Sequence, residues 1–215
     1  MMRIRLHIVS VGTFLLMYLV AGYAQEVVKL PAPKTEGGMP LQQALKERKS
    51  SREFNGKKLP LPVLSNLLWA AWGVNRPDGH HTAPSASNRQ EIDVYVATAD
   101  GLYLYEAKEH QLRRVLAEDI RALTGTQPFV KDAAVNLVYV ADLAKGNRTD
   151  PAAIEFYTGT NAAFLAQNVY LFCASERLAT VVRASIDRTA LAKAMKLRSD
   201  QKIALAQSVG YPKQP

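Results

Sequence analysis

The chain has 215 residues, and 48% of them are hydrophobic, a proportion that excludes a disordered protein. Its 27 basic and 19 acidic residues give a formal net charge of +8. The basic residues are scattered and form no stripe interleaved with aromatic residues, which argues against nucleic-acid binding. Cys173 is the only cysteine, so no intrachain disulfide can form, and its apolar neighbours favour a buried packing residue over a nucleophile.

The first 24 residues predict a Sec-type signal peptide. Arg3 and Arg5 give a basic start, an apolar run follows from Ile8 to Val20, and Gly22-Tyr23-Ala24 offers small residues where a signal peptidase cleaves. An uncleaved membrane anchor is the alternative, but the run is short for a spanning helix of ~20 residues. We therefore expect cleavage before Gln25, a periplasmic or extracellular mature protein, and no stable membrane anchor after cleavage.

Residues 25–39, rich in Pro and Gly, predict an extended arm, and residues 40–215 predict a single domain. Helices are expected over residues 41–48, 61–72, 118–123 and 151–178, with a last one that Asp187 caps and that runs to Met195. Strands are expected over residues 92–97, 102–105, 111–116, 134–140, 181–186 and 202–209. Two of these strands form a hairpin and the order is irregular, which predicts an α+β fold rather than a doubly wound one.

One segment, at residues 48–54, has the composition of a phosphate site. It reads Arg-Lys-Ser-Ser-Arg-Glu-Phe, and in an extended chain Arg48, Ser50 and Arg52 lie on the same side. Two guanidinium groups and a hydroxyl suit a phosphate because Arg donates paired, charge-assisted hydrogen bonds. The alternative is an ordinary basic helix end that the helix dipole favours.

A second segment lies in the long loop over residues 74–90. Pro84, Ser85, Ala86 and Asn88 make a loop of small and polar residues, whose backbone N–H groups can approach a flat polar ligand. The alternative is a turn that precedes the strand at Ile92. Taken together, the two segments indicate a nucleotide-like cofactor.

The two segments, in this order, resemble the FMN-dependent nitroreductase family. The stretch between them, Leu-Leu-Trp-Ala-Ala-Trp-Gly-Val at 67–74, and the later Gly101–Tyr105 and His110–Leu112 are similar to its SagB/thiazole-oxidase branch. The likeness covers about residues 40–212. It implies a central, mostly antiparallel sheet flanked by helices, in an intertwined homodimer with FMN at the interface. The flavin contacts that it implies in one subunit are Arg48, Lys49, Ser50 and Arg52, and those from the partner subunit are Pro84, Ser85, Ala86 and Asn88.

The resemblance is weaker towards the C-terminus. Many family members carry glycines where this chain has Arg177 and Ala179. By position, Val182, Arg183 and Ala184 should pass the N5 edge of the flavin, where Arg183 either adds positive charge or is a surface residue. Lys213 either closes over the phosphate or is a solvated tail residue.

No metal site is expected, because the adjacent His80 and His81 point apart and lack a third ligand. The two histidines can instead line a substrate pocket.

The resemblance therefore implies an exported FMN-dependent oxidoreductase. The bound flavin carries the chemistry in a ping-pong cycle with an electron donor and a small organic substrate, and no catalytic side chain is expected. The alternative is a flavin-free binding protein on the same scaffold, which the residues at 177 and 179 and the short C-terminus motivate.

Overall fold

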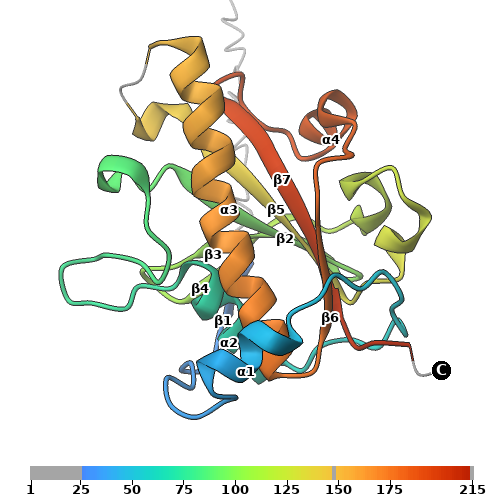
Figure 1. Cartoon of the computed structure of the whole chain (residues 1–215). Coiled ribbons are helices and arrows are strands. Elements are labelled where there is room, and N and C mark those ends of the chain that lie inside the picture. The colour runs from blue at the N-terminus through green and yellow to red at the C-terminus, as the bar shows by residue number, and fades with distance from the viewer. Residues whose placement is uncertain (1–25, 147–148, 214–215) are drawn as a thin grey trace, which may run out of the picture.

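The computed structural model describes residues 26–146 and 149–213. The predicted signal peptide, residues 1–24, lies outside these residues. In the described part, four α-helices surround one sheet (Figure 1). They are α1 (Leu41–Glu47), α2 (Leu61–Trp72), α3 (Pro151–Ser175) and α4 (Arg188–Ala194). None of these helices combines the length and the apolarity that a membrane crossing requires.

The sheet has seven strands in the order β1-β4-β3-β2-β5-β7-β6, and every neighbouring pair is antiparallel. Its strands are β1 (Val27–Lys29), β2 (Ile92–Thr98), β3 (Gly101–Glu106), β4 (Gln111–Leu116), β5 (Val135–Asp142), β6 (Ala179–Arg183) and β7 (Gln201–Gly210). This α+β architecture is the one that the sequence predicted. Strands β1 and β6 are the two edges.

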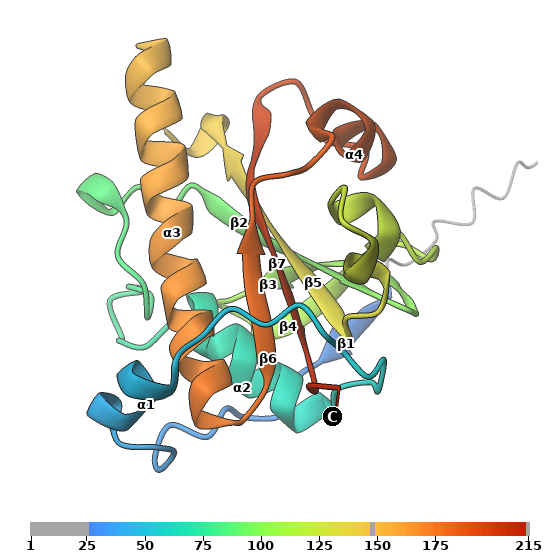
Figure 2. The same ribbon diagram turned by 45° about the vertical axis from the view of Figure 1, so that its right-hand side comes forward.

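Strand β5 lies at the centre of the molecule and is buried along its whole length. Because side chains alternate along a strand, Leu137 and Tyr139 face α2 and α3, whereas Val138 and Val140 face α4. The sheet thus separates two apolar cores, with α3 on one face and α4 on the other (Figure 2).

One predicted helix does not form and another ends earlier than predicted, and local hydrogen bonds explain both. Residues 118–123 form no α-helix; a short 3₁₀ turn, Arg121–Thr124, stands there. The Asp119 carboxylate accepts hydrogen bonds from the backbone and the guanidinium of Arg121, an arrangement that competes with helical bonding. Helix α3 ends at Ser175 rather than Leu178, because Arg177 adopts a left-handed backbone (φ 56°) and Leu178 N–H bonds Cys173 O.

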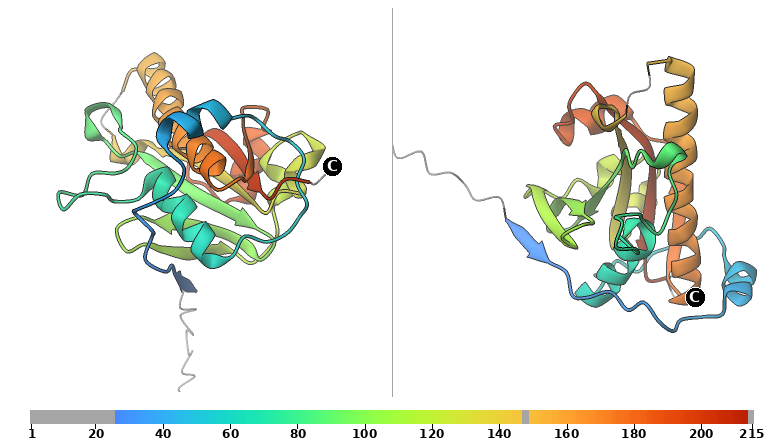
Figure 3. Two further views of the ribbon diagram at one scale, coloured as in Figure 1. Left: turned by 60° about the horizontal axis from the view of Figure 1, so that its bottom comes forward. Right: turned by 90° about the vertical axis from the view of Figure 1, so that its left-hand side faces the viewer.

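The N-terminal arm runs under the sheet from β1 to α1 (Figure 3). His110 holds it in place: its Nε2 lies 2.7 Å from Ser65 Oγ and 3.1 Å from the carbonyl oxygen of Pro31, while its Nδ1 lies 2.9 Å from Tyr105 Oη. Burial lowers the pKa of His110 below its ordinary value, so the imidazole is neutral at pH 7.

Candidate functional site

The candidate phosphate-binding segment, residues 48–54, lies along the outer edge of β6. Helix α1 ends at Glu47, and the chain continues in an extended conformation from Arg48 onward. Ser51 N–H donates to the carbonyl oxygen of Thr180 in β6 at 2.8 Å, and further along Lys213 N–H donates to Glu53 O at 3.2 Å. These bonds hold the segment against the sheet.

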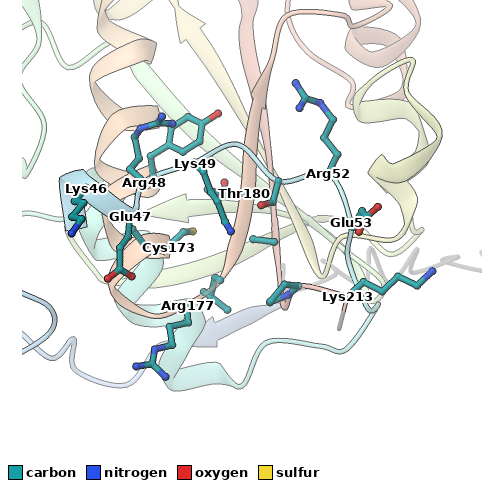
Figure 4. A pocket seen from close by; sticks show the side chains of 16 residues that line it. Lys46, Glu47, Arg48, Lys49, Arg52, Glu53, Cys173, Arg177, Thr180 and Lys213 are labelled. Carbon is teal, nitrogen blue, oxygen red and sulfur yellow. The ribbon is translucent and has the colours of Figure 1, made fainter. Parts of the chain in front are cut away.

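Because the backbone is extended, successive side chains of this segment point to opposite sides, as predicted. Arg48 and Arg52 project to one side, whereas Lys49 projects to the other, towards Cys173 and Thr180 (Figure 4). Ser50 shares the side of the two arginines, since its Oγ lies 2.8 Å from Tyr170 Oη and Arg48 Cζ lies 5.2 Å from the centre of the Tyr170 ring. Two guanidinium groups and a hydroxyl therefore flank the same face.

Tyr170 is a site residue that sequence reasoning missed. It lies in the apolar stretch of α3, where helical periodicity presents it as a core residue, and it is only 8% exposed. Its hydroxyl accepts a hydrogen bond from Val182 N–H at 3.0 Å, in addition to its bond with Ser50. Tyr170 thus joins the candidate phosphate-binding segment to the edge of β6.

A pocket of about 810 Å³ opens beside the segment. Its floor is largely apolar and includes Cys173, Leu178 and Ala179. Six cationic residues and two acidic ones line it; the cationic ones are Lys46, Arg48, Lys49, Arg52, Arg177 and Lys213. Within residues 26–146 and 149–213, none of these six forms a salt bridge. The region is therefore electropositive and attracts anions.

Lys213 lines the pocket but is not brought to the two arginines. Its backbone is fixed by the bond to Glu53, and its side chain projects away from Arg48 and Arg52 (Figure 4).

The predicted loop at Pro84–Asn88 lies apart from this pocket, on the other side of α3 (Figure 1). Its backbone turns sharply, with positive φ at Ser87 and Asn88, and Ala86 N–H donates to the buried Asn161 side chain. Pro84 and Asn88 are exposed, and Ser85 Oγ accepts from the N–H of Gln90. One subunit therefore does not bring the two segments together.

Arg183 is neither a surface residue nor a pocket residue. Its side chain passes to the face of the sheet opposite Tyr170 and is 5% exposed. The guanidinium donates to Thr124 O at 2.7 Å, Asn136 Oδ1 at 2.9 Å and Ser208 Oγ at 3.1 Å. Burial lowers its pKa to about 10, so Arg183 remains cationic at neutral pH. Of its neighbours, Val182 presents its N–H to Tyr170 and Ala184 is exposed at the strand end.

Arg177 stands where many family members carry a glycine, and its backbone conformation explains how the chain tolerates this difference. A glycine is favoured there because the residue adopts φ 56°, and Arg177 adopts the same conformation at a cost of about 1 kcal/mol. The path of the chain into β6 therefore does not require a glycine at this position.

His80 and His81 point to different partners. His81 stacks on the Trp72 ring with 4.0 Å between centroids, and its Nδ1 lies 2.7 Å from Trp72 O. His80 Nδ1 lies 2.8 Å from Asp78 Oδ1. Over the described residues, no group of three or more His, Cys, Asp or Glu is placed to hold a metal ion.

Comparison with known proteins identifies the fold and the family. The sequence profile of the Nitroreductase family matches residues 45–211. The chain belongs to the nitroreductase family. A Methanocaldococcus jannaschii protein assigned as a nitroreductase is 32% identical over 151 residues, which are 66% of this chain and 76% of that protein. A crystal structure from Ralstonia eutropha, also assigned as a nitroreductase, superposes with a TM-score of 0.85 at 42% identity and covers 90% of this chain and 93% of that one.

Two more distant structures share the nitroreductase fold. One is a Desulfovibrio desulfuricans protein assigned as a nitroreductase, solved in complex with FMN (TM-score 0.60, 22% identity, 83% of this chain and 89% of that one). The other is a chain of the Escherichia coli microcin synthetase McbBCD complex (TM-score 0.67, 18% identity, 96% of this chain and 85% of that one). At these identities, the likeness establishes the fold alone.

The residues of the site fit a phosphate-bearing flavin. Arg48 and Arg52 offer donors on one face and, among the residues that the structure describes, have no acidic partner; Ser50 offers a hydroxyl beside them. An isolated cation gains most from an anionic ligand, because the charge is otherwise compensated only by water.

We predict that Arg183 acts in stability rather than in cofactor binding. Arg183→Met should lower the free energy of unfolding of the flavin-free protein by about 2–4 kcal/mol, since it removes three buried hydrogen bonds and, of the three acceptors, only Asn136 Oδ1 keeps another donor within the described residues, the Ser208 hydroxyl. Urea denaturation measures this. Arg177→Met, at an exposed cation, should change stability by no more than about 0.5 kcal/mol. An Arg183→Met protein with full stability and weakened flavin binding would contradict the assignment.

Proposed function

We propose that this member of the nitroreductase family is an FMN-dependent oxidoreductase. It exchanges electrons with a donor and a small organic substrate in a ping-pong cycle. The observation that carries the proposal is the common orientation of Arg48, Ser50 and Arg52 along β6. The FMN complex of the Desulfovibrio desulfuricans neighbour supports it at the level of the fold. We also propose membership of the SagB/thiazole-oxidase branch, on the motifs at 67–74 and 101–112.

Each residue has a defined task in this proposal. When bound, the flavin supplies reversible two-electron chemistry. Arg48 and Arg52 would bind the phosphate, Ser50 would donate a hydrogen bond, and the backbone at the end of β6 and at Ala184 would approach the ring. Cys173 takes no part, because burial raises the pKa of its thiol well above the ordinary range and keeps it protonated.

The second candidate is a flavin-free binding protein on the same scaffold. Ala179, at a position where many family members carry a glycine, motivates it. The backbone at Arg177 weakens it, because Arg177 adopts the left-handed conformation (φ 56°) that a glycine would favour. The two candidates differ in the colour of the purified protein. A yellow protein with nearly one flavin per chain supports the oxidoreductase.

We predict that heat releases FMN rather than FAD, because the sequence offers a phosphate-binding segment but nothing that suggests a pocket for adenine; mass spectrometry decides this. Arg48→Ala should weaken FMN binding by about 1.5–3 kcal/mol, or about 10- to 150-fold, the range for a hydrogen bond to a charged group. Lys108→Ala, which removes the same charge from the exposed β3–β4 turn, should leave the affinity unchanged. FAD as the major species would refute the cofactor, and equal affinities would remove Arg48 from the site.

We further propose that the active unit is a homodimer. Apolar side chains are exposed on the outer faces of α1 and α3, which pack together: Leu41 (59% exposed), Leu45 (51%), Phe156 (64%) and Phe164 (42%). Apolar helix faces of this kind need cover from a second protein surface, and a partner subunit would also bring Pro84–Asn88 to the flavin.

Sedimentation should therefore give a dimer that Phe164→Glu converts to monomers with weakened FMN binding. A charge on the exposed Lys108 (Lys108→Glu) serves as the control and should leave the dimer intact. A wild-type monomer that retains a full complement of flavin at low concentration would contradict the homodimer.

We also propose that the protein works outside the cytoplasm. The basic start, the apolar run and Gly22-Tyr23-Ala24 support it. N-terminal sequencing of protein from the native cell should begin at Gln25, and the flavin-loaded form should appear in the exported fraction. An intact N-terminus on the native protein, or flavin-loaded protein confined to the cytosol, would overturn this proposal.

A further inference from the structure

Tyr170 occupies a junction that the family likeness does not assign. Its hydroxyl lies between the side chain of Ser50 and the backbone of Val182, at 2.8 Å and 3.0 Å. Its ring lies beneath the Arg48 guanidinium, 5.2 Å from Cζ to the ring centre. A single side chain of α3 therefore contacts both the candidate phosphate-binding segment and the outer edge of β6.

The hydrogens at this junction can be assigned from chemistry. The Val182 amide can only donate, so it takes one lone pair of Tyr170 Oη. Tyr170 is 8% exposed, and in the described part of the chain Ser50 Oγ is the remaining partner of its hydroxyl. If Ser50 donated to Tyr170, the buried phenolic hydrogen would lack an acceptor, which costs about 1–3 kcal/mol. The favoured arrangement has Tyr170 donating to Ser50.

This arrangement leaves the Ser50 hydrogen free. Ser50 is itself exposed, and its bond to Tyr170, whose ring lies under Arg48, puts it on the arginine side of the segment. Its hydroxyl, with one lone pair occupied by Tyr170, is then directed outward as a donor. Such a donor between two cations suits a ligand oxygen that only accepts hydrogen bonds, as the oxygens of a phosphate ester do.

We propose that Tyr170 is a positioning residue that fixes Ser50 as a hydrogen-bond donor to the phosphate end of the flavin, and that it thereby selects FMN over unphosphorylated riboflavin. The inference rests on the proposed function, since it concerns the same flavin site. Tyr170 acts through Ser50 and does not itself touch the ligand. Its ring separately supports Arg48 from below.

A double-mutant cycle on FMN affinity tests this, with quenching of flavin fluorescence as the readout. Tyr170→Phe keeps the ring under Arg48 and removes only the hydroxyl, whereas Ser50→Ala removes its partner. Each change should weaken FMN binding about 5- to 10-fold. The double variant should bind FMN as well as the weaker-binding of the two single variants, because the two groups act in series. Riboflavin affinity should change less than 2-fold, so that the preference for FMN falls.

Two further variants separate positioning from a purely structural role. Tyr105→Phe removes another buried tyrosine hydroxyl, the one bonded to His110, and should leave FMN affinity unchanged. Ser50→Thr keeps the hydroxyl and should restore most of the affinity and the preference for FMN, provided that Tyr170 is intact. A structural role would instead lower both flavin affinities together.

The outcomes are distinct. A wild-type protein that binds no FMN overturns the proposed function and this inference with it. A wild-type protein that binds FMN, with additive effects at residues 50 and 170 or an unchanged preference over riboflavin, overturns the inference alone.

Discussion

Strand β6 ends the sheet, and the polar groups along its outer edge have no neighbouring strand to bond. An open strand edge is a site for unwanted pairing with other chains, and folded proteins cover it. Here Ser51 N–H bonds Thr180 O, and Tyr170 Oη bonds Val182 N–H. Satisfying this edge fixes the backbone of residues 48–52, and the alternation of an extended chain then sends Arg48 and Arg52 to the same side. The common orientation of the two arginines thus follows from the need to cover the edge of the sheet.

The arginines near the site lie in two different environments. Arg183 is buried, and its Nη atoms donate to three neutral acceptors, so its position is consistent with a structural role. Arg48 and Arg52 lie at the surface of an electropositive pocket and, within the described residues, form no salt bridge. Water compensates these charges in the free protein, and an anionic ligand can replace that water at little cost in protein rearrangement.

Much of the fold follows from local patterns in the sequence. Helix α2 spans Leu61–Trp72 as predicted, because prolines suit its start and its apolar residues share one face. Gly73 does stand at its end, but the reason is steric rather than a left-handed backbone: its φ is −69°, and a Cβ there would lie 2.3 Å from Cδ1 of Trp69, one turn back in the same helix. The helix predicted at 118–123 failed because a side chain, rather than helix propensity, decides the backbone at Asp119.

The candidate site was predicted only in part, for a similar reason. Alternation along residues 48–52 is a local property and could be read from the sequence. The role of Tyr170 depends on which strand α3 packs against, and the burial of Arg183 depends on acceptors in β5, β7 and the turn at Thr124. These partners lie up to 59 residues away along the chain, so no pattern of neighbouring residues reveals them.

The two edges of the sheet have a consequence for the order in which the protein can be assembled. Residues from the first quarter of the chain lie at both edges: β1 forms one edge by pairing with β4, and Ser51 bonds β6 at the other. Strand β6 in turn pairs only with β7, which ends at Gly210. The segment at 48–52 therefore leaves the ribosome early but has no completed sheet edge to dock on until β7 has been made. Contacts of such long range are slow to form, and this side of the sheet is therefore expected to be completed late in folding.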